Sequence, residues 1–325
     1  MPQPTLLITG GAGFIGSYVN KFAQQAGYRT IILDNLSRSR RPPKTAGQFI
    51  QGDIGDAHLL DHLFSQMHID AVMHFAAWID VGESVRDPSR YYLNNVIHTH
   101  TLLESMLKHD IKNFIFSSSA AIYGYPHTSL IDETHPCDPI NPYGRSKLMI
   151  EHMLQDFDHA YGLKSCSLRY FNAAGGDPEG KIRYSSHRAT NLIPRLLRSL
   201  ETKDPIYLFG TDYDTIDGTC IRDYIHIHDL AQAHLLGLEQ LWQTHQSQAY
   251  NLGNGKGYSV WEVIHAVEQV TGHQVPVIET ARRPGDPPIL VADSRKALQK
   301  LRWVPVYPSL EKMIEHAWQV LDHAT

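Results

Sequence analysis

The chain has 325 residues, of which 42% are hydrophobic and 19% are charged, and its formal net charge is −5. These values are typical of a globular protein with a sizeable core. The negative charge argues against nucleic acid as the main partner, because phosphate binding needs clustered lysine and arginine. No apolar stretch approaches the roughly 20 residues of a membrane span, and the first residues show no signal-peptide pattern.

Cysteine and histidine usage argues against a disulfide framework and against a metal site. The three cysteines, Cys137, Cys166 and Cys220, are an odd number without CxxC spacing. This pattern favours reduced thiols and a cytoplasmic location. His226 and His228 alternate with isoleucines, which predicts one face of a strand rather than a pair of metal ligands. We therefore expect no bound metal and no contact with a membrane.

The first part of the chain alternates short apolar runs with longer helical patterns. Strands are predicted at 6–9, 30–33, 49–51, 70–75, 113–117 and 165–170. Helices are predicted at 14–27, 57–67, 88–109 and 142–161. Because strands and helices alternate and the strands are apolar, the pattern implies an α/β fold with a Rossmann-like, doubly wound parallel sheet.

Beyond Asn172 the pattern loosens into turn-rich segments and shorter elements, although 248–252 reads as a strand that returns to the sheet. We expect a Rossmann-like domain over 1–172 with returning segments near 225–255. Residues 173–325 would form mainly a smaller α/β cap that binds the substrate. In such folds the ligand cleft lies at the carboxyl ends of the strands, between sheet and cap.

The segment Thr9-Gly10-Gly11-Ala12-Gly13-Phe14-Ile15-Gly16 follows the first predicted strand and opens the first helix. Its glycines allow a sharp turn, a close approach of the backbone to a pyrophosphate and tight packing of helix on sheet. The positive end of the helix dipole then faces the phosphates. We therefore predict dinucleotide binding by Gly10, Gly13, Phe14, Ile15 and Gly16.

Asp34 ends the second predicted strand, 18 residues beyond Gly16. A carboxylate at this place binds the hydroxyls of the adenosine ribose and repels a 2′-phosphate. Asp34 therefore favours NAD over NADP. Arg38 and Arg40 follow closely and keep NADP open as an alternative.

A second motif begins at Pro142, the predicted first residue of a helix. Tyr143 and Lys147 are four residues apart and share one face of that helix. A phenol has an unperturbed pKa of about 10 and is a poor base at neutral pH. The ammonium of Lys147 and the positive nicotinamide of an oxidised cofactor would lower the pKa of Tyr143. Ser119, which ends the serine run after the fifth strand, would hydrogen-bond the same substrate oxygen.

Together these motifs resemble the extended short-chain dehydrogenase/reductase family and, within it, the bacterial UDP-glucose 4-epimerases. The resemblance covers nearly the whole chain. Its more specific segments are Phe75-Ala76-Ala77, Val81-Gly82-Glu83-Ser84-Val85, Tyr91-Tyr92, Asn94-Asn95-Val96, Leu168-Arg169-Tyr170-Phe171-Asn172, residues 217–226 and Arg282-Arg283-Pro284-Gly285-Asp286.

The resemblance implies a role for individual residues. The catalytic group would be Ser119, Tyr143 and Lys147, and the last two would also contact the cofactor. Further NAD contacts would come from Asp34, Asn35, Ser37, Asp53, Ile54, Phe75, Ala76, Ala77, Asn94, Ser117, Tyr170 and Phe171. The UDP-sugar would contact Ser119, Tyr143, Asn172, Asn191, Leu192, Phe209, Arg222, Tyr224, Arg283, Asp286 and Leu290. The charge pattern agrees, because two arginines suit a diphosphate.

The reaction that the resemblance implies is a redox-neutral inversion at C4 of a UDP-hexose, which interconverts UDP-glucose and UDP-galactose. Tyr143 would take the proton of the 4-hydroxyl while hydride passes to NAD. The 4-keto sugar would then turn about its link to the anchored UDP, and hydride would return to its other face. NAD would stay tightly bound and be regenerated in each turnover.

Other activities are weighed against this one. Dehydration is disfavoured because no carboxylate directly follows Ser119. A net NAD-dependent oxidoreductase, acting on an alcohol or a nucleotide sugar, would exchange its cofactor and would not need the two arginines. A non-catalytic dinucleotide-binding protein would usually lack Tyr143 or Lys147, and both are present.

Departures from the family pattern bear on cofactor and substrate. Ile79 stands where many members have a lysine near the cofactor, and 181–188 lacks the acidic stretch of close relatives. Leu290 aligns with a residue that limits bulk at the sugar C2, where tyrosine goes with rejection of N-acetyl sugars. The resemblance therefore favours UDP-glucose, with UDP-N-acetylglucosamine used more slowly and UDP-xylose left open. It also implies a homodimer through helices 88–109 and 142–161.

Overall fold

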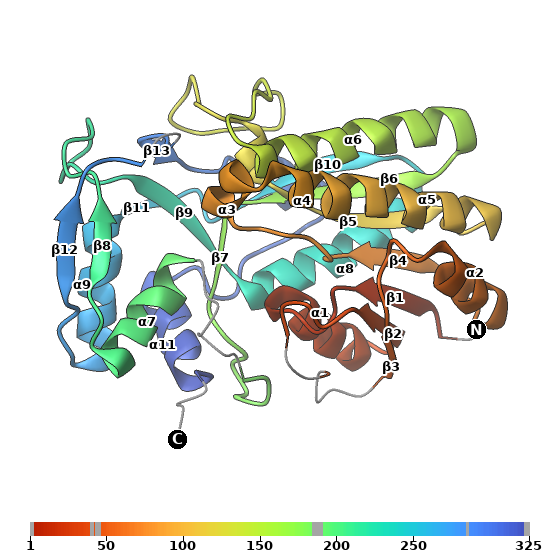
Figure 1. Ribbon diagram of the computed structural model, residues 1–325, viewed down its shortest axis with the longest axis horizontal. Coiled ribbons are helices and arrows are strands. Elements are labelled where there is room, and N and C mark those ends of the chain that lie inside the picture. Colours follow the sequence, from red (N-terminus) through yellow and green to blue (C-terminus); the bar gives the residue numbers. More distant parts are fainter. Residues whose placement is uncertain (1–2, 40–41, 43–46, 184–190, 284–285, 322–325) are drawn as a thin grey trace.

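A seven-stranded parallel sheet forms the centre of the protein, which Figure 1 shows as a computed structural model. The structure describes residues 3–39, 42, 47–183, 191–283 and 286–321. The strands of this sheet are β1 (Thr5–Thr9), β2 (Arg29–Asp34), β3 (Gln48–Gln51), β4 (Ala71–His74), β5 (Asn113–Ser119), β6 (Lys164–Tyr170) and β10 (Gln248–Leu252). Their order is β10-β6-β5-β4-β1-β2-β3, which confirms the Rossmann-like, doubly wound sheet.

Helices cover both faces of the sheet. They are α1 (Phe14–Gln25), α2 (Ala57–Gln66), α5 (His98–Lys108), α6 (Pro142–Tyr161) and α8 (Ile227–Thr244). Side chains of α1 and α8 pack with Leu6 and Ile8 on one face of the sheet. Side chains of α2, α5 and α6 pack with Leu7 on the other face. Both faces are therefore buried, which explains why the strands are apolar at nearly every position.

The helix predicted at 142–161 is confirmed, and local signals explain its bounds. The side chain of Asn141 accepts the backbone N–H of Gly144 and caps the first turn, where Pro142 also lies. At the other end Gly162 adopts a left-handed conformation, with φ of 69°. These signals place Tyr143 in the first turn of α6, at its positive end.

The prediction of one continuous helix over 88–109 is wrong, because a π-helical turn interrupts it. The structure has α4 (Pro88–Tyr91), then a π-helical turn, η1 (Tyr92–Ile97), and then α5. A π-helical turn is widened relative to an α-helix and is frequent at functional sites. Here it buries Asn95, which lies beside the site described below. A short helix that was not predicted, α3 (Val81–Arg86), comes just before.

His226 and His228 do not form one face of a strand, contrary to the prediction. The strand β9 (Ile221–His226) ends at the first of them, whose side chain accepts the backbone N–H of His228 at 2.9 Å and caps α8. An apolar alternation of only four residues fits a strand and a helix start equally well, and the cap decides between them. Within the described ranges, no group of three or more potential metal ligands is present.

The remaining elements form a smaller α/β unit, which includes the helices at the left of Figure 1. Its sheet is built around β9, which pairs with β7 (Asn172–Ala174), β11 (Gly257–Ser259) and β13 (Ile289–Leu290). A second, two-stranded sheet pairs β8 (Ile206–Phe209) with β12 (Val277–Thr280). Its helices are α7 (Leu192–Thr202), α9 (Val260–Thr271) and α11 (Leu310–Gln319), whereas α10 (Arg295–Lys300) packs on the central sheet beside β10. Since β7 follows β6 almost directly, the unit begins at the carboxyl edge of the central sheet.

A search of the described residues finds no helix with the length and apolarity to cross a membrane.

Three buried histidines are held neutral in the folded protein. Burial lowers the pKa of His74 to about 3, that of His226 to about 3 and that of His234 to about 4. In the unfolded chain each would titrate near 6.5. Between these values the unfolded state binds more protons, so the free energy of unfolding falls as the pH drops below 6.5. Two buried carboxyls, Asp223 and Asp229, have pKa values raised to about 6 and act in the opposite direction.

We expect His234→Phe to make the protein less acid-sensitive. The ring of His234 lies 4.8 Å from that of Phe75, and its Nε2 has no hydrogen-bond partner among the described residues. Phenylalanine keeps the ring packing and gives up one hydrogen bond, that of Nδ1 with the carbonyl of Leu230 at 2.8 Å. One group that titrates only in the unfolded state contributes about 1.4 kcal/mol per pH unit. Urea unfolding between pH 4.5 and 6 should therefore give a flatter pH dependence for the variant by about that slope. An unchanged slope would contradict the neutral state of His234.

Candidate active site

The glycine loop lies at the carboxyl end of β1, against the end of β4. Gly10 has φ of +71°, and a Cβ there would lie 2.6 Å from the backbone nitrogen of Ala76. A Cβ at Gly16 would lie 2.4 Å from the carbonyl oxygen of Gly10. Both glycines are therefore required by close backbone approach. Among the described residues, a Cβ on Gly13 would have one neighbour within 4 Å, the carbonyl oxygen of Gly10 at 3.2 Å, so this glycine borders space that those residues leave open.

The start of α1 has no side-chain cap, unlike the starts of α2 and α6. The side chain of Asp56 caps α2 and that of Asn141 caps α6, but Gly13, at the same position of α1, has no side chain to offer. No acidic residue lies in the first turn of α1. The positive end of this helix therefore faces the glycine loop, and no carboxylate in its first turn neutralises it. An anionic ligand would bind favourably at such a helix end.

Asp34 lies at the end of β2 and holds the glycine loop. Its carboxylate accepts the backbone N–H of Ala12 at 2.9 Å and that of Leu36 at 2.8 Å. Burial raises the pKa of Asp34, and these two hydrogen bonds partly offset the rise. Each carboxylate oxygen keeps lone-pair capacity for a further donor, such as a ribose hydroxyl. Beside it, the amide of Asn35 donates to Asp53 at 2.7 Å, which brings the loops after β2 and β3 together.

The segment after β4 completes this edge and is fixed by the π-helical turn. Phe75 and Ala76 contact the glycine loop, and the backbone of Trp78 is held on both sides by Asn95. The Asn95 amide oxygen accepts the Trp78 N–H at 2.9 Å, and its nitrogen donates to the Trp78 carbonyl at 2.9 Å and to Ser146 of α6 at 3.1 Å. Asn94 donates to Asn95 from the same turn. Asn95 therefore links the cofactor-side loop to the helix of Tyr143, a role that the sequence motifs did not reveal.

The three residues of the predicted catalytic group lie together at the ends of β5 and α6. Ser119 is the last residue of β5, and it forms a hydrogen bond with Tyr143. Lys147 is 2% exposed and donates from Nζ to the carbonyl oxygen of Ser117 at 2.8 Å. Its Nζ lies 6.0 Å from the centre of the Tyr143 ring. The hydroxyl of Ser117 is in turn hydrogen-bonded to that of Tyr170.

Burial shifts the pKa values of Tyr143 and Lys147 away from their ordinary values. Burial raises the pKa of Tyr143, and the hydrogen bond with Ser119 lowers it only in part. Burial also lowers the pKa of Lys147 to about 7, against the attraction of Glu151. Burial therefore favours the neutral form of both side chains.

A buried polar network lies on the other face of β5, beneath the catalytic group. Arg169 forms an ion pair of 2.5 Å with Glu151, which also accepts the hydroxyl of Ser118 at 2.5 Å. Arg169 donates to the hydroxyl of Tyr123 at 3.0 Å, and that hydroxyl donates to Asn251 at 2.6 Å. The network connects β5, β6, β10, α6 and the loop after Ser119, so it fixes the backbone from which the catalytic residues project.

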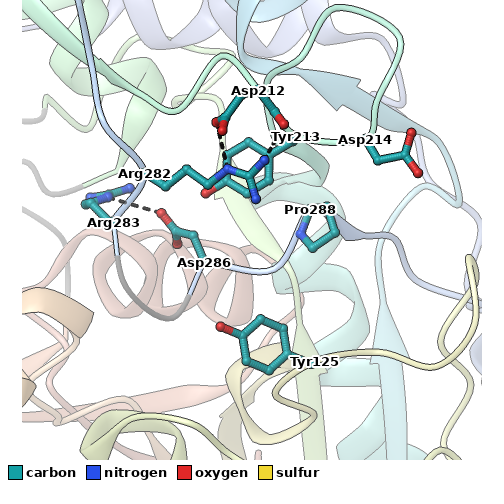
Figure 2. A pocket seen from close by; sticks show the side chains of 8 residues that line it. All are labelled: Tyr125, Asp212, Tyr213, Asp214, Arg282, Arg283, Asp286 and Pro288. Atoms are coloured by element: carbon teal, nitrogen blue, oxygen red, sulfur yellow. Dashed lines mark hydrogen bonds and ion pairs between the residues drawn. The ribbon is translucent and has the colours of Figure 1, made fainter.

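Figure 2 shows a pocket of about 520 Å³ between the loop after β5 and the smaller α/β unit. Arg283 and Asp286 form an ion pair of 3.1 Å inside it, and the same aspartate lies 3.8 Å from Arg222. The guanidinium of Arg283 also lies 4.5 Å from the centre of the Phe209 ring. The structure therefore brings four of the predicted substrate residues together at one pocket, whose lining holds two arginines and three aspartates.

The other predicted substrate residues lie around this group. Leu290 pairs with Arg222 in the β13–β9 register and packs near Ala120 and Ile122, which directly follow Ser119. Asn172 pairs with Tyr224 across β7 and β9, and its amide donates to the carbonyl of Asp223 at 2.8 Å.

The remaining members of the predicted set are placed without a direct contact to the pocket. Leu192 packs on the cluster that contains Tyr224, whereas Asn191 is exposed at the start of α7. Ile54 and Phe171 are buried, and Ser37 is exposed on the loop after β2. The segment 184–190 and residues 284–285, which belong to two motifs of the sequence, lie outside the described residues.

Six of the eight lining residues of this pocket were not predicted as site residues: Tyr125, Asp212, Tyr213, Asp214, Arg282 and Pro288. Arg282 is held by Asp212 at 2.7 Å and lies 4.2 Å from the centre of the Tyr213 ring, and Tyr125 lines the opposite side in Figure 2. Arg195 of α7 is a further cation nearby, since the positive charge of Arg283 lowers its pKa together with burial. Adjacent arginines at 282–283 were visible in the sequence, but Asp212, which holds Arg282, is 70 residues away.

Comparison with known proteins places these features in a family. The model of the NAD dependent epimerase/dehydratase family matches residues 6–253, which is most of the chain. The chain belongs to this family. Its members of similar sequence include a UDP-glucose 4-epimerase of Halalkalibacterium halodurans, 51% identical over 96% of this chain and 94% of the relative. Another is a UDP-glucose 4-epimerase of Azospirillum brasilense, 48% identical over 97% of this chain and 91% of the relative.

A solved structure of the epimerase/dehydratase family agrees with the fold throughout. The UDP-glucose 4-epimerase from Brucella ovis, crystallised in complex with NAD, superposes with a TM-score of 0.94 at 45% identity and with 97% of each chain covered. The residues of the present chain fit that cofactor. The open side of Gly13, the uncapped start of α1 and the carboxylate of Asp34 supply room, positive potential and a ribose acceptor in one place.

Proposed function

We propose that this protein is an NAD-dependent UDP-glucose 4-epimerase, which interconverts UDP-glucose and UDP-galactose. The observation that carries the proposal is the pairing of Ser119 with Tyr143 at the carboxyl end of β5, in a fold that also has a glycine loop after β1 and a pocket lined by Arg283 and Asp286. When bound, NAD supplies the group that takes hydride from C4 of the sugar and returns it. Family membership and the relatives' activities support the same reaction.

In this proposal the chain's own residues divide the work between chemistry and anchoring. Tyr143 holds and moves the proton of the sugar 4-hydroxyl, and Ser119 hydrogen-bonds the same oxygen. Lys147, whose Nζ lies 6.0 Å from the centre of the Tyr143 ring, contributes positive charge near the phenol together with the oxidised cofactor, and both charges oppose the effect of burial on the pKa of Tyr143. Arg222 and Arg283 hold the diphosphate with forked hydrogen bonds. Asp34, Asn35 and the glycine loop hold the adenosine half of NAD.

The experiment that tests the function uses the purified protein without added cofactor. It is incubated separately with UDP-glucose, UDP-N-acetylglucosamine and UDP-xylose, and NMR measures the C4 epimer of each. Conversion of UDP-glucose to UDP-galactose without added NAD is expected. If the protein carries NAD but no sugar is epimerised, a net oxidoreductase takes the place of this proposal.

A second candidate activity concerns sugars with an N-acetyl group at C2. Leu290 packs against the residues after Ser119, so its bulk borders the space beside the catalytic group. We expect Leu290→Tyr to reduce epimerisation of UDP-N-acetylglucosamine at least about tenfold more than that of UDP-glucose, because an added ring fills that space. Leu290→Ala should change the ratio in the opposite direction. Equal changes for both sugars would exclude Leu290 as the residue that limits bulk.

A homodimer is part of the proposal. Large apolar side chains are exposed on the adjacent segments α3, η1 and α6: Val85 is 63% exposed, Leu93 49%, Ile97 55% and Met149 44%. A second copy packed on these segments would bury them. Sedimentation velocity measures the mass in solution.

A cytoplasmic location is also proposed, and the free thiols of Cys137, Cys166 and Cys220 support it.

A further inference from the structure

The ring of Trp78 lies beside two guanidinium groups at the cofactor edge of the sheet. The Cζ atom of Arg90 is 3.4 Å from the ring centre, and that of Arg38 is 5.2 Å away. Because Asn95 holds both the N–H and the carbonyl of Trp78, the ring projects from a fixed backbone. Stacking on a fixed ring restricts where each guanidinium can lie.

The two arginines differ in how their charge is balanced. Arg90 forms an ion pair with Glu83 at 3.0 Å. For Arg38, which is half-buried, no carboxylate lies within ion-pair distance in the ranges that the structure describes. A partly desolvated cation without an anion is unfavourable, and binding an anion relieves that cost. Arg38 is therefore the cation at this edge that has room for an external partner.

The segment that carries Arg38 lies over the glycine loop. It begins four residues after Asp34, and the hydroxyl of the next residue, Ser39, donates to the carbonyl of Ala12 at 2.6 Å. That hydrogen bond ties the segment to the turn between β1 and α1, where Gly13 borders open space. The Trp78 ring approaches from the end of β4. The Arg38 guanidinium is thus confined where the carboxyl ends of three neighbouring strands converge.

We propose that Arg38 is a phosphate-binding residue of the dinucleotide site and that its guanidinium, steadied by Trp78, pairs with the pyrophosphate of NAD. This inference rests on the proposed cofactor. The alternative source of the same chemistry is the 2′-phosphate of NADP. The carboxylate of Asp34, four residues earlier and hydrogen-bonded to the loop at Ala12, would repel that group, so the pyrophosphate is favoured.

The test compares Arg38→Gln with Arg90→Gln, since each removes a guanidinium from the same ring. The readout is the rate at which bound NAD exchanges with labelled NAD in the purified holoprotein, at low and at high salt, with thermal unfolding as the check on folding. A charge-assisted phosphate contact is worth roughly tenfold to a hundredfold in affinity. Arg38→Gln should accelerate exchange by about that factor and weaken its salt dependence. The exchange rate of Arg90→Gln should stay within about twofold of the wild type, because Arg90 is paired with Glu83 and not with the cofactor.

The possible outcomes separate the alternatives. Exchange of NAD at the wild-type rate in Arg38→Gln would overturn the proposal. Equal acceleration in both variants would also overturn it, since the effect would then come from the loss of stacking on Trp78. If Arg38→Gln changes only the retention of labelled NADP, the contact is to a 2′-phosphate and the pyrophosphate assignment is wrong. Failure of epimerisation would appear in the NMR assay instead, and would leave the exchange rates as they are.

Discussion

Replacing Tyr143 with phenylalanine should reduce epimerisation of UDP-glucose by between about a hundredfold and ten thousandfold, the usual contribution of a positioned acid–base group. The variant loses only the hydroxyl that moves the proton, while the ring continues to pack beside Lys147 and the glycine loop is untouched. The NAD content after purification, measured by extraction and chromatography, should therefore match that of the wild type. The rate is measured by the NMR assay at saturating substrate.

The matched control is Tyr161→Phe, which removes a phenol from the other end of the same helix. Tyr161 is 53% exposed and lies far along α6 from the catalytic end. We expect this variant to keep the wild-type rate and stability. If Tyr143→Phe keeps more than about a tenth of the activity, Tyr143 is not the residue that moves the proton, since general acid–base catalysis contributes at least a hundredfold.

Replacing Glu151 with leucine should destabilise the protein by about 3–5 kcal/mol, because it leaves the buried guanidinium of Arg169 without its partner. Both members of the pair are under 10% exposed, so water cannot take over the charge. The double variant Glu151→Leu with Arg169→Met should recover most of the loss, because no uncompensated charge remains. Urea unfolding of the wild type, the single variant and the double variant measures the difference.

The same pair of variants tests whether the network acts on the catalytic group. The negative charge of Glu151 opposes the fall in the pKa of Lys147, which burial lowers to about 7. Without Glu151, Lys147 should lose its proton at lower pH, so the activity of the double variant should decline on the alkaline side earlier than that of the wild type. A pH profile that superposes on the wild type would limit Glu151 and Arg169 to a structural role.

Short-range signals in the sequence determined the first half of the fold. The bounds of α6 follow from Asn141, Pro142 and Gly162, all within one turn of its ends. Caps and apolar periodicity act between neighbours in the chain, so they can be read without tertiary structure. For the same reason the sequence was sufficient to predict Ser119, Tyr143 and Lys147 as one group, since two of them share a helix face and the third ends a strand.

Contacts between distant segments were decided only by the tertiary structure. The π-helical turn interrupts a segment whose sequence reads as one helix. The side chain of Asn95, which this turn buries, donates hydrogen bonds to Trp78 and Ser146, both distant in the chain. Glu151 and Arg169 meet across two elements, and Arg282 meets Asp212 across 70 residues. A charged or polar side chain carries no local sign of its partner. The strands bring such side chains together, and packing then selects which of them are buried and paired.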